Sequence, residues 1–204
     1  MHHHHPGHRF DPAKAARLLD RQWRLIEDPL ELVRAMGIGT GMRVVDLGCG
    51  PGFFTRAILD AVGASGHVAA VEMQGEILDL FRRQIAPRPN LEVHRADLCA
   101  TGLARGQWDV AFLAFTLHEV EVATALEEIN AILADAGRLI VLEWGPGSLC
   151  PSRDGGEPAG PPADHRLAQE VLEHSLAEAG LVREADGQRL GGCHYWIRAV
   201  RANR

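Results

Sequence analysis

The 204-residue chain lacks several features that would assign it to a common protein class. No apolar run approaches the roughly 18 residues of a membrane span, and residues 1–10 have no hydrophobic core of the kind found in secretory signals. The four cysteines, at positions 49, 99, 150 and 193, form no C-x-x-C pair. We therefore expect a cytoplasmic protein with reduced thiols and no membrane insertion.

Excess positive charge is also absent. The formal net charge is −6, which argues against non-specific binding to nucleic acid or to acidic membranes. The hydrophobic content of 46% is ordinary for a globular protein, and a chain of this length buries about 70% of its unfolded surface as one domain. We expect a flexible His-rich tail over residues 1–11. Its histidines at 2–5 bind divalent metal loosely, whether they are native or the remnant of a purification tag.

A glycine-rich stretch occupies residues 44–55, Val-Val-Asp-Leu-Gly-Cys-Gly-Pro-Gly-Phe-Phe-Thr. Glycine at positions 48, 50 and 52 lets the backbone turn sharply after a strand and approach a ligand closely. The apolar segment from Phe53 is typical of a helix, whose first N–H groups and positive dipole end face such a ligand. The pattern predicts a strand–loop–helix unit that holds a nucleotide-like molecule.

The glycine spacing excludes two common nucleotide-binding loops. A dinucleotide fingerprint needs G-x-G-x-x-G, but Phe53 stands where the third glycine belongs. A P-loop needs a Lys-Ser/Thr pair after the glycines, and none follows here. The pattern is instead D-x-G-x-G-x-G, with Asp46 just before the loop.

Strand-like and helix-like segments alternate along the chain, which predicts a parallel sheet covered by helices. We expect strands at 44–47, 67–71, 91–94, 108–115 and 138–143, and helices at 53–62, 74–85, 116–134 and 164–179. Two last strands, at 181–187 and 193–200, are separated by Gly191-Gly192, which permits a tight reversal and predicts an antiparallel pair. Residues 145–163 are crowded with glycine and proline, as in a lid or binding loop.

The D-x-G-x-G-x-G segment resembles motif I of the class I S-adenosylmethionine (SAM)-dependent methyltransferases. The resemblance implies SAM as cofactor and a Rossmann-like α/β fold. That fold is a seven-stranded sheet, mostly parallel with an antiparallel last strand, with helices on both faces and here an N-terminal helical cap. A single domain would span 12–204, with the cap at 12–40 and the SAM-binding core at 41–204. Gly7–Pro12 and the block from Val44 are also similar to small bacterial methyltransferases of the type 11 and ubiquinone/menaquinone groups.

The resemblance also assigns residues to the cofactor. Motif I would pass under its methionine part, with Asp46 ordering the loop or meeting the amino group. The loop residues concerned are Asp46, Gly48, Cys49, Gly50, Gly52 and Phe53. We interpret Cys49 as a small packing residue and not as a nucleophile.

Residues at the ends of the next three strands complete this set. Glu72 lies 20 residues after Gly52 and would accept hydrogen bonds from the ribose hydroxyls, a chemistry shared with dinucleotide enzymes. Asp97, with the Leu98 backbone N–H, would bind the exocyclic amine of adenine. Met73 would pack on the adenine face, and Phe115 and Thr116 would line the methionine portion.

Residues after the fourth and fifth strands are candidates for methyl transfer and for binding the acceptor. His118 has an intrinsic pKa suited to a general base, and Glu119 would orient it or act through water. The structural alternatives are that His118 caps the next helix and that Glu119 favours the N-terminus of that helix. Trp144 would form an apolar wall of the acceptor pocket, while His165 and Arg166 would contact an anionic acceptor or simply begin a helix.

We therefore expect a SAM-dependent methyltransferase acting on a small molecule. Two alternatives stay open: an NAD(P)-dependent oxidoreductase, although the only tyrosine, Tyr195, is not in a Tyr-x-x-x-Lys pair, and a metalloid or thiol methyltransferase using Cys99 and Cys150. A non-catalytic SAM- or metal-binding module is a third option. No nucleic acid partner is expected, and the cap offers a surface for a homodimer.

Overall fold

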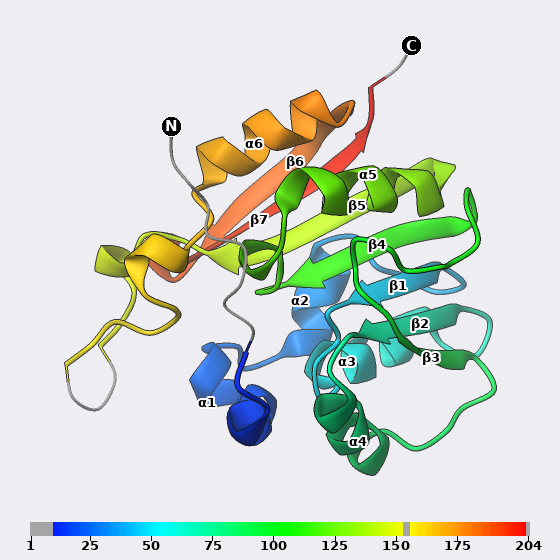
Figure 1. The fold of residues 1–204 in the computed structure, drawn as a ribbon, viewed down its shortest axis with the longest axis horizontal. Helices are drawn as coiled ribbons and strands as arrows, with labels where there is room; N and C mark the ends of the chain where they lie inside the picture. The colour runs from blue at the N-terminus through cyan, green and yellow to red at the C-terminus, as the bar shows by residue number, and fades with distance from the viewer. Residues whose placement is uncertain (1–9, 153–155, 203–204) are drawn as a thin grey trace.

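The computed structural model describes residues 10–152 and 156–202, so the histidines at 2–5 lie outside the described residues. Its centre is one seven-stranded sheet of order β3-β2-β1-β4-β5-β7-β6 (Figure 1). The strands are β1 (Arg43–Leu47), β2 (His67–Glu72), β3 (Leu91–Arg95), β4 (Trp108–Ala114), β5 (Leu133–Trp144), β6 (Leu181–Arg189) and β7 (His194–Arg201). The first five run parallel, and β7 is antiparallel to both β5 and β6. The expected fold, including its antiparallel last strand, is confirmed.

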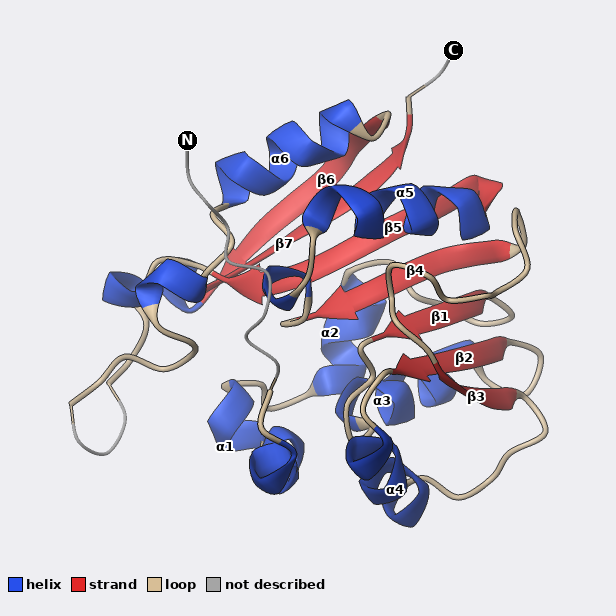
Figure 2. Cartoon of the chain, in the orientation of Figure 1, coloured by secondary structure: helices blue, strands red, loops and turns tan. Residues whose placement is uncertain are grey.

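Helices cover both faces of the sheet (Figure 2). One apolar layer packs α2 (Pro29–Ala35), α3 (Phe53–Val62) and α4 (Gly75–Gln84) on one face. The other layer packs α5 (Val122–Ile132) and α6 (Gln169–Glu178) on the opposite face. Because neighbouring strand residues point to opposite faces, β1 contributes Val44 to the first layer and Val45 to the second. This two-sided burial explains why the central strands are continuous apolar runs.

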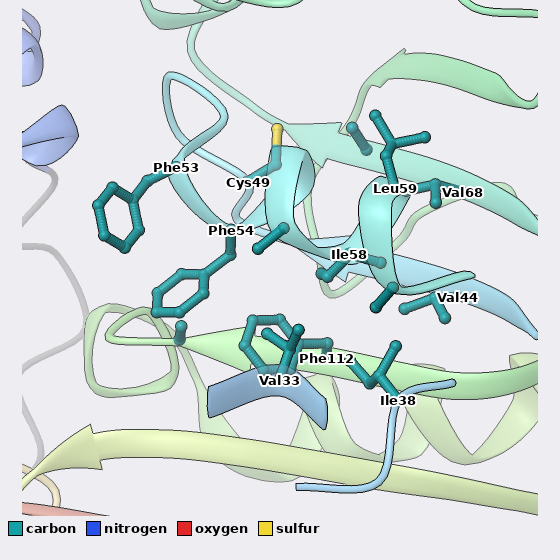
Figure 3. Packing of buried hydrophobic residues seen from close by; sticks show 14 of the residues in the cluster. Val33, Ile38, Val44, Cys49, Phe53, Phe54, Ile58, Leu59, Val68 and Phe112 are labelled. Atoms are coloured by element: carbon teal, nitrogen blue, oxygen red, sulfur yellow. The ribbon is translucent and has the colours of Figure 1, made fainter. Parts of the chain in front are cut away.

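The close packing of α3 fixes the position of the glycine loop that precedes it. Phe54, on its first turn, lies edge-on to Phe112 of β4 with ring centroids 5.2 Å apart, and Val33 of α2 lies in the same cluster (Figure 3). Phe53 belongs to the same cluster and lies beside Phe54 (Figure 3). The first turn of α3 is therefore fixed against the sheet directly beside the loop.

The N-terminal cap consists of a 3₁₀ segment, η1 (Pro12–Leu19), followed by α1 (Arg21–Arg24) and α2. Pro29 stands at the first position of α2, where its fixed φ suits a helix start. The Asp28 carboxylate caps that helix by accepting a hydrogen bond from the Glu31 N–H at 2.9 Å. The cap therefore has the helical character that its sequence predicts, in shorter pieces.

Two expected helix starts are wrong. The helix expected from residue 116 is divided into a 3₁₀ turn, η2 (Leu117–Glu119), and α5, because the Glu121 carboxylate accepts from the Ala123 and Thr124 N–H groups and starts α5 there. The helix expected from residue 164 begins at Gln169, after the 3₁₀ turn η4 (Ala163–His165). Both changes leave the candidate acceptor residues on turns and not on helices.

Candidate active site

The glycine loop lies at the carboxyl end of β1. All three of its glycines have positive φ, at 72° for Gly48, 56° for Gly50 and 94° for Gly52. A Cβ on Gly48 would lie 2.3 Å from the Thr116 methyl carbon, and one on Gly52 would lie 2.7 Å from Ile85 Cγ1. The loop therefore requires glycine twice over, for its backbone conformation and for its close approach to Thr116 and the end of α4.

Glu72 ends β2 beside this loop. Its carboxylate accepts hydrogen bonds from the Gly50 N–H at 3.2 Å and from the Gln74 N–H at 2.9 Å. Burial raises the Glu72 pKa, and these backbone donors offset part of that effect. A carboxylate offers about four lone-pair positions, so acceptor capacity remains for a ribose hydroxyl. The geometry fits the expected cofactor role and adds a second one, which is to hold the loop.

Asp46 is buried beneath the loop and not at its surface. Its carboxylate accepts a 2.6 Å hydrogen bond from the Thr55 hydroxyl on α3. Burial raises the Asp46 pKa to about 7, while Thr55 and the charge of Arg24 lower it and Glu72 raises it further. Of the two roles considered for Asp46, this position favours ordering the loop.

Cys49 is buried in the same loop, and Phe53 follows it on α3. Burial raises the pKa of the Cys49 thiol well above its usual value, with Asp46 and Glu72 adding to the effect. The thiol therefore stays protonated, as expected for a packing residue. Phe53 lies edge-on to Phe54, with ring centroids 5.0 Å apart.

A buried arginine of the cap completes this side of the site, and sequence reasoning missed it. The Arg24 guanidinium lies over the rings of Phe53, Phe54 and Phe115 at 5.1, 5.6 and 5.6 Å from their centroids. Its Nε donates to the Leu18 carbonyl at 2.6 Å. Burial lowers the Arg24 pKa to about 10, so the group stays charged. Nothing in the sequence distinguishes it from the other arginines of the cap.

The expected adenine residues lie past the ends of β2 and β3. Asp97 is exposed and accepts the Cys99 N–H at 2.9 Å, while Leu98 is buried. The Met73 carbonyl accepts from Arg95 Nε at 3.3 Å. Asp97 keeps further acceptor positions toward solvent, which suits an exocyclic amine.

The N-terminal segment reaches over this edge of the sheet. Gln74 Nε2 donates to the Phe10 carbonyl at 3.1 Å, and the Phe10 N–H faces the Glu119 carboxylate. Leu18 lies against Gly50, 3.8 Å from where a Cβ would stand. The start of the cap therefore contacts both Gln74, which follows β2, and Glu119, which follows β4. The sequence did not indicate these contacts.

His118, on η2, is paired with Glu143 at the end of β5. Nδ1 of His118 lies 2.9 Å from Glu143 Oε2, the His118 backbone N–H lies 3.3 Å from Oε1, and both side chains are buried. Burial alone would lower the His118 pKa, but the charge and hydrogen bond of Glu143, with the charge of Glu119, raise it overall. Glu143 therefore fixes the tautomer of His118 so that Nε2 is left for chemistry. Sequence reasoning gave Glu143 no role.

Glu119 is next to this pair. Its Oε1 lies 3.9 Å from His118 Nε2, and burial raises its pKa to about 7, with Glu143 and Glu72 also raising it and His118 lowering it. Neither residue caps α5, because Glu121 does. The capping role considered for His118 is therefore wrong.

Phe115, Trp144 and His194 form an aromatic cluster on the opposite face of the sheet from Glu143. Phe115 lies 4.8 Å from Trp144 and 5.0 Å from His194 between ring centroids. Its φ of 58° is unusual for a side chain of this size. The next residue, Thr116, contacts Gly48 of motif I. The cluster therefore borders the glycine loop.

Arg166 is used to hold the loop at 145–161. Its guanidinium donates to the carbonyls of Pro161, Gly145 and Ala159 at 2.9, 2.6 and 2.5 Å. These contacts favour a structural role over contact with an anionic acceptor. His165 is half-exposed on η4, with Nε2 3.9 Å from an Asp164 carboxylate oxygen.

The expectation of reduced cysteines is wrong for one pair. Cys150 and Cys193 form a disulfide that joins the Gly/Pro-rich loop to the start of β7, 43 residues further along the chain. Cys49 and Cys99 are free. Sequence spacing could not reveal the pair, because the sheet topology brings the two residues together.

The residues of the alternative reactions are engaged elsewhere. The Tyr195 hydroxyl donates to the Leu167 carbonyl at 2.8 Å inside the core, so it offers no acid to an oxidoreductase. Cys150 pairs with Cys193 and not with Cys99, which removes the thiol pair expected for metalloid chemistry. Among residues 10–152 and 156–202, no group of three side chains could hold a metal ion, and no helix has the length and apolarity to cross a membrane.

Comparisons with known proteins agree with this geometry. A family model described as a methyltransferase domain matches residues 44–137. A demethylmenaquinone methyltransferase of Staphylococcus aureus is 27% identical over 113 residues, which is 55% of this chain and 47% of that protein. The match thus spans about half the length of the curated relatives.

Solved structures extend the likeness to nearly the whole chain. A SAM-dependent methyltransferase from Aquifex aeolicus superimposes with a TM-score of 0.82 at 26% identity, covering 94% of this chain and 98% of that one. Geranyl diphosphate C-methyltransferase from Streptomyces coelicolor A3(2), solved with S-adenosyl-L-homocysteine, has a TM-score of 0.67 at 16% identity, covering 88% and 78%, and shows the shared fold. Family model, relatives and structures together support a class I SAM-dependent methyltransferase.

Proposed function

We propose that this chain, a class I SAM-dependent methyltransferase by motif and fold, transfers the methyl group of SAM to a small apolar molecule. The observation that carries the proposal is the glycine loop held by Glu72 at the carboxyl edge of the sheet. Ligands of such sheets bind at that edge. The acceptor stays a proposal, because the similarity spans only about half of the curated relatives.

The residues around the loop fit the cofactor. Glu72 has acceptor capacity left for a ribose hydroxyl, and exposed Asp97 has it for the adenine amine. The loop glycines present backbone without side chains, and Phe115 and Thr116 close the methionine end. SAM, when bound, supplies an electrophilic methyl group. The chain then has to align the nucleophilic atom of the acceptor with that methyl group and take up the proton that this atom loses.

His118 is the base that we assign to this step. Glu143 accepts the Nδ1 proton, so neutral His118 presents unprotonated Nε2 to the acceptor. Glu119, whose pKa burial raises to about 7, lies 3.9 Å from Nε2 and is placed to receive the proton in turn. Because these contacts raise the His118 pKa above its ordinary value of 6.5, we expect the methyl-transfer rate to rise with pH until that pKa is passed.

The acceptor is best matched by an uncharged, mainly apolar molecule. Phe115 and Trp144 supply aromatic walls, and the Arg166 guanidinium donates its hydrogen bonds to loop carbonyls. One relative is named for demethylmenaquinone and one neighbour for geranyl diphosphate, both of which are small molecules. The net charge of −6 supports a small molecule over nucleic acid. Cytoplasmic location and a homodimer through the cap stay predictions.

Calorimetric titration with SAM, S-adenosylhomocysteine and NAD tests the cofactor. We expect binding of the first two and not of NAD. Glu72→Ala should weaken SAM binding by roughly a hundredfold, since charge-assisted hydrogen bonds to the carboxylate are lost. Glu76→Ala, which removes an exposed acid at the start of α4, is the matched control and should bind SAM as the wild type does. Equal SAM affinity in wild type and Glu72→Ala would remove the ribose assignment.

Single-turnover methyl transfer with labelled SAM and a panel of quinols, phenols, amines and thiols tests the reaction. His118→Asn should lower the rate constant by roughly two to four orders of magnitude while leaving SAM affinity unchanged. An active His118→Asn protein with an unaltered pH profile would show that no base is needed.

A further inference from the structure

His194 is fully buried at the start of β7, in the middle of a row across three strands. Its neighbour in the β5 register is Trp144, and its neighbour in the β6 register is Arg189. Directly opposed residues in antiparallel strands share one face of the sheet. The three side chains therefore lie side by side beneath the Gly/Pro-rich loop, and the proposed function uses neither His194 nor Arg189.

Arg189 determines which ring nitrogen of His194 carries the proton. Nη1 of Arg189 lies 3.3 Å from His194 Nδ1, and a guanidinium can only donate. Nδ1 must therefore accept. Burial, followed by the charges of Arg189, Arg166 and Arg24, lowers the His194 pKa to about 3, so the ring is neutral. A neutral ring that accepts at Nδ1 carries its single proton at Nε2.

That Nε2–H donor has no hydrogen-bond partner within the described residues, although it is fully buried. A buried polar group without a partner is costly, so most such groups in native proteins are paired. Nδ1 faces Arg189, and Nε2 lies on the other side of the ring. The aromatic rings that pack on His194 are those of Trp144 and Phe115, with centroids 4.5 and 5.0 Å from the His194 centroid.

The surroundings of this donor are apolar and adjoin the reaction site. Trp144 packs with Ala159, Cys193, Leu25 and Phe115. Leu25 and Phe115 have positive φ values of 56° and 58°, although neither is a glycine. Strained backbone of this kind gathers at ligand-binding sites. Phe115 is also half-exposed, so the cluster reaches the surface at this residue.

We propose that the Nε2–H of His194 binds and positions the methyl acceptor, and that this acceptor is a flat aromatic molecule with one hydrogen-bond-accepting oxygen. The inference rests on the proposed methyl transfer. Phe115 and Trp144 receive the aromatic body, and His194 binds the oxygen. Arg24, Arg166 and Arg189 surround the ring with positive charge, which favours an oxygen that carries partial negative charge, such as that of a phenol.

A purely structural role would have the Nε2–H point at the Trp144 ring, which lies at 80° to the imidazole. Binding of 1-naphthol and of naphthalene separates the two roles, because only 1-naphthol has an oxygen. Each is titrated by NMR into protein saturated with S-adenosylhomocysteine. We expect the wild type to bind 1-naphthol roughly tenfold more tightly than naphthalene.

His194→Phe keeps a ring and removes the donor, so we expect it to bind both molecules equally. His194→Gln keeps an N–H and should retain a preference for 1-naphthol, which also covers the case in which the Phe variant fails to fold. The proposal is overturned if the wild type shows no preference or binds neither molecule, or if His194→Phe keeps the preference. S-adenosylhomocysteine affinity, measured separately, distinguishes this failure from failure of the methyltransferase assignment.

Discussion

Glu143→Gln is the most informative single change in this protein. It keeps the size of the side chain and removes its charge. In the wild type, Glu143 lies 2.9 Å from His118 Nδ1 and accepts from the backbone N–H groups of His118 and Trp144 at 3.3 Å each. An amide cannot accept all three, because its –NH₂ group faces donors instead of accepting from them.

The cost follows from this burial. Breaking a buried charge pair costs about 3–5 kcal/mol, and the amide oxygen keeps part of the hydrogen bonding. We therefore expect the free energy of unfolding to fall by about 3 kcal/mol at pH 6. His118 and Glu143 have exposed side-chain fractions of 8% and 1%, so screening by solvent is small.

The loss should depend on pH with a definite sign. The contacts of Glu143 and Glu119 raise the His118 pKa in the folded state above its ordinary value of 6.5. The stability that this provides is fully present below pH 6.5 and is lost as the pH rises through the folded-state pKa. Without the Glu143 charge, burial dominates and lowers the His118 pKa. The gap between wild type and variant should therefore shrink to about 1.5 kcal/mol at pH 9.

Urea denaturation of both proteins at pH 6 and pH 9 measures this gap. An NMR titration of the His118 ring protons should show its pKa falling in the variant. Glu127→Gln, at an exposed acid on α5, is the control and should change neither quantity. An unchanged His118 pKa, or a gap that widens toward pH 9, would refute the pairing of His118 with Glu143.

Three further changes test the loop and its surroundings. In urea denaturation, Asp46→Asn should stabilise the protein by about 3 kcal/mol at pH 8 and little at pH 4. The reason is that burial raises the Asp46 pKa to about 7, so ionisation of Asp46 is costly in the folded state. A gain in stability that does not vary with pH would contradict this. Gly52→Ala should cost about 3 kcal/mol in the same assay, against about 1 kcal/mol for Gly102→Ala, since both glycines have positive φ but only Gly52 also lacks room for a Cβ. Cys193→Ser should lower the free energy of unfolding by about 4 kcal/mol without reductant and by much less with dithiothreitol, because it removes a disulfide between residues 43 apart. An equal loss in both conditions would mean that the wild-type thiols are reduced.

Local patterns were sufficient for the fold and for one side of the site. The helix expected at 53–62 and the strand expected from 67 lie where the structure places α3 and β2. Gly191-Gly192 predicted the reversal before β7, and β6 and β7 are indeed antiparallel. These features depend on residues that are close in the sequence. Side-chain periodicity and the conformational freedom of glycine act over the same short range.

Residues from distant segments were the ones that local patterns could not place. The Arg24 side chain extends from the cap to the ring of Phe115. His194 contacts Trp144 only because β7 pairs with β5. The alternation of side chains along β5 sends Glu143 toward His118 and Trp144 toward His194, on opposite faces of the sheet.

The sequence by itself determined the glycine loop, the strand–helix order and the acid at the end of β2, because each is set by steric and hydrophobic preferences within a few residues. Only the tertiary structure decided which buried groups meet: His118 with Glu143, His194 with Arg189, and Cys150 with Cys193. Partners separated by 25 and 43 residues, in the first and last of these pairs, are brought together by strand order and register, which no local pattern specifies.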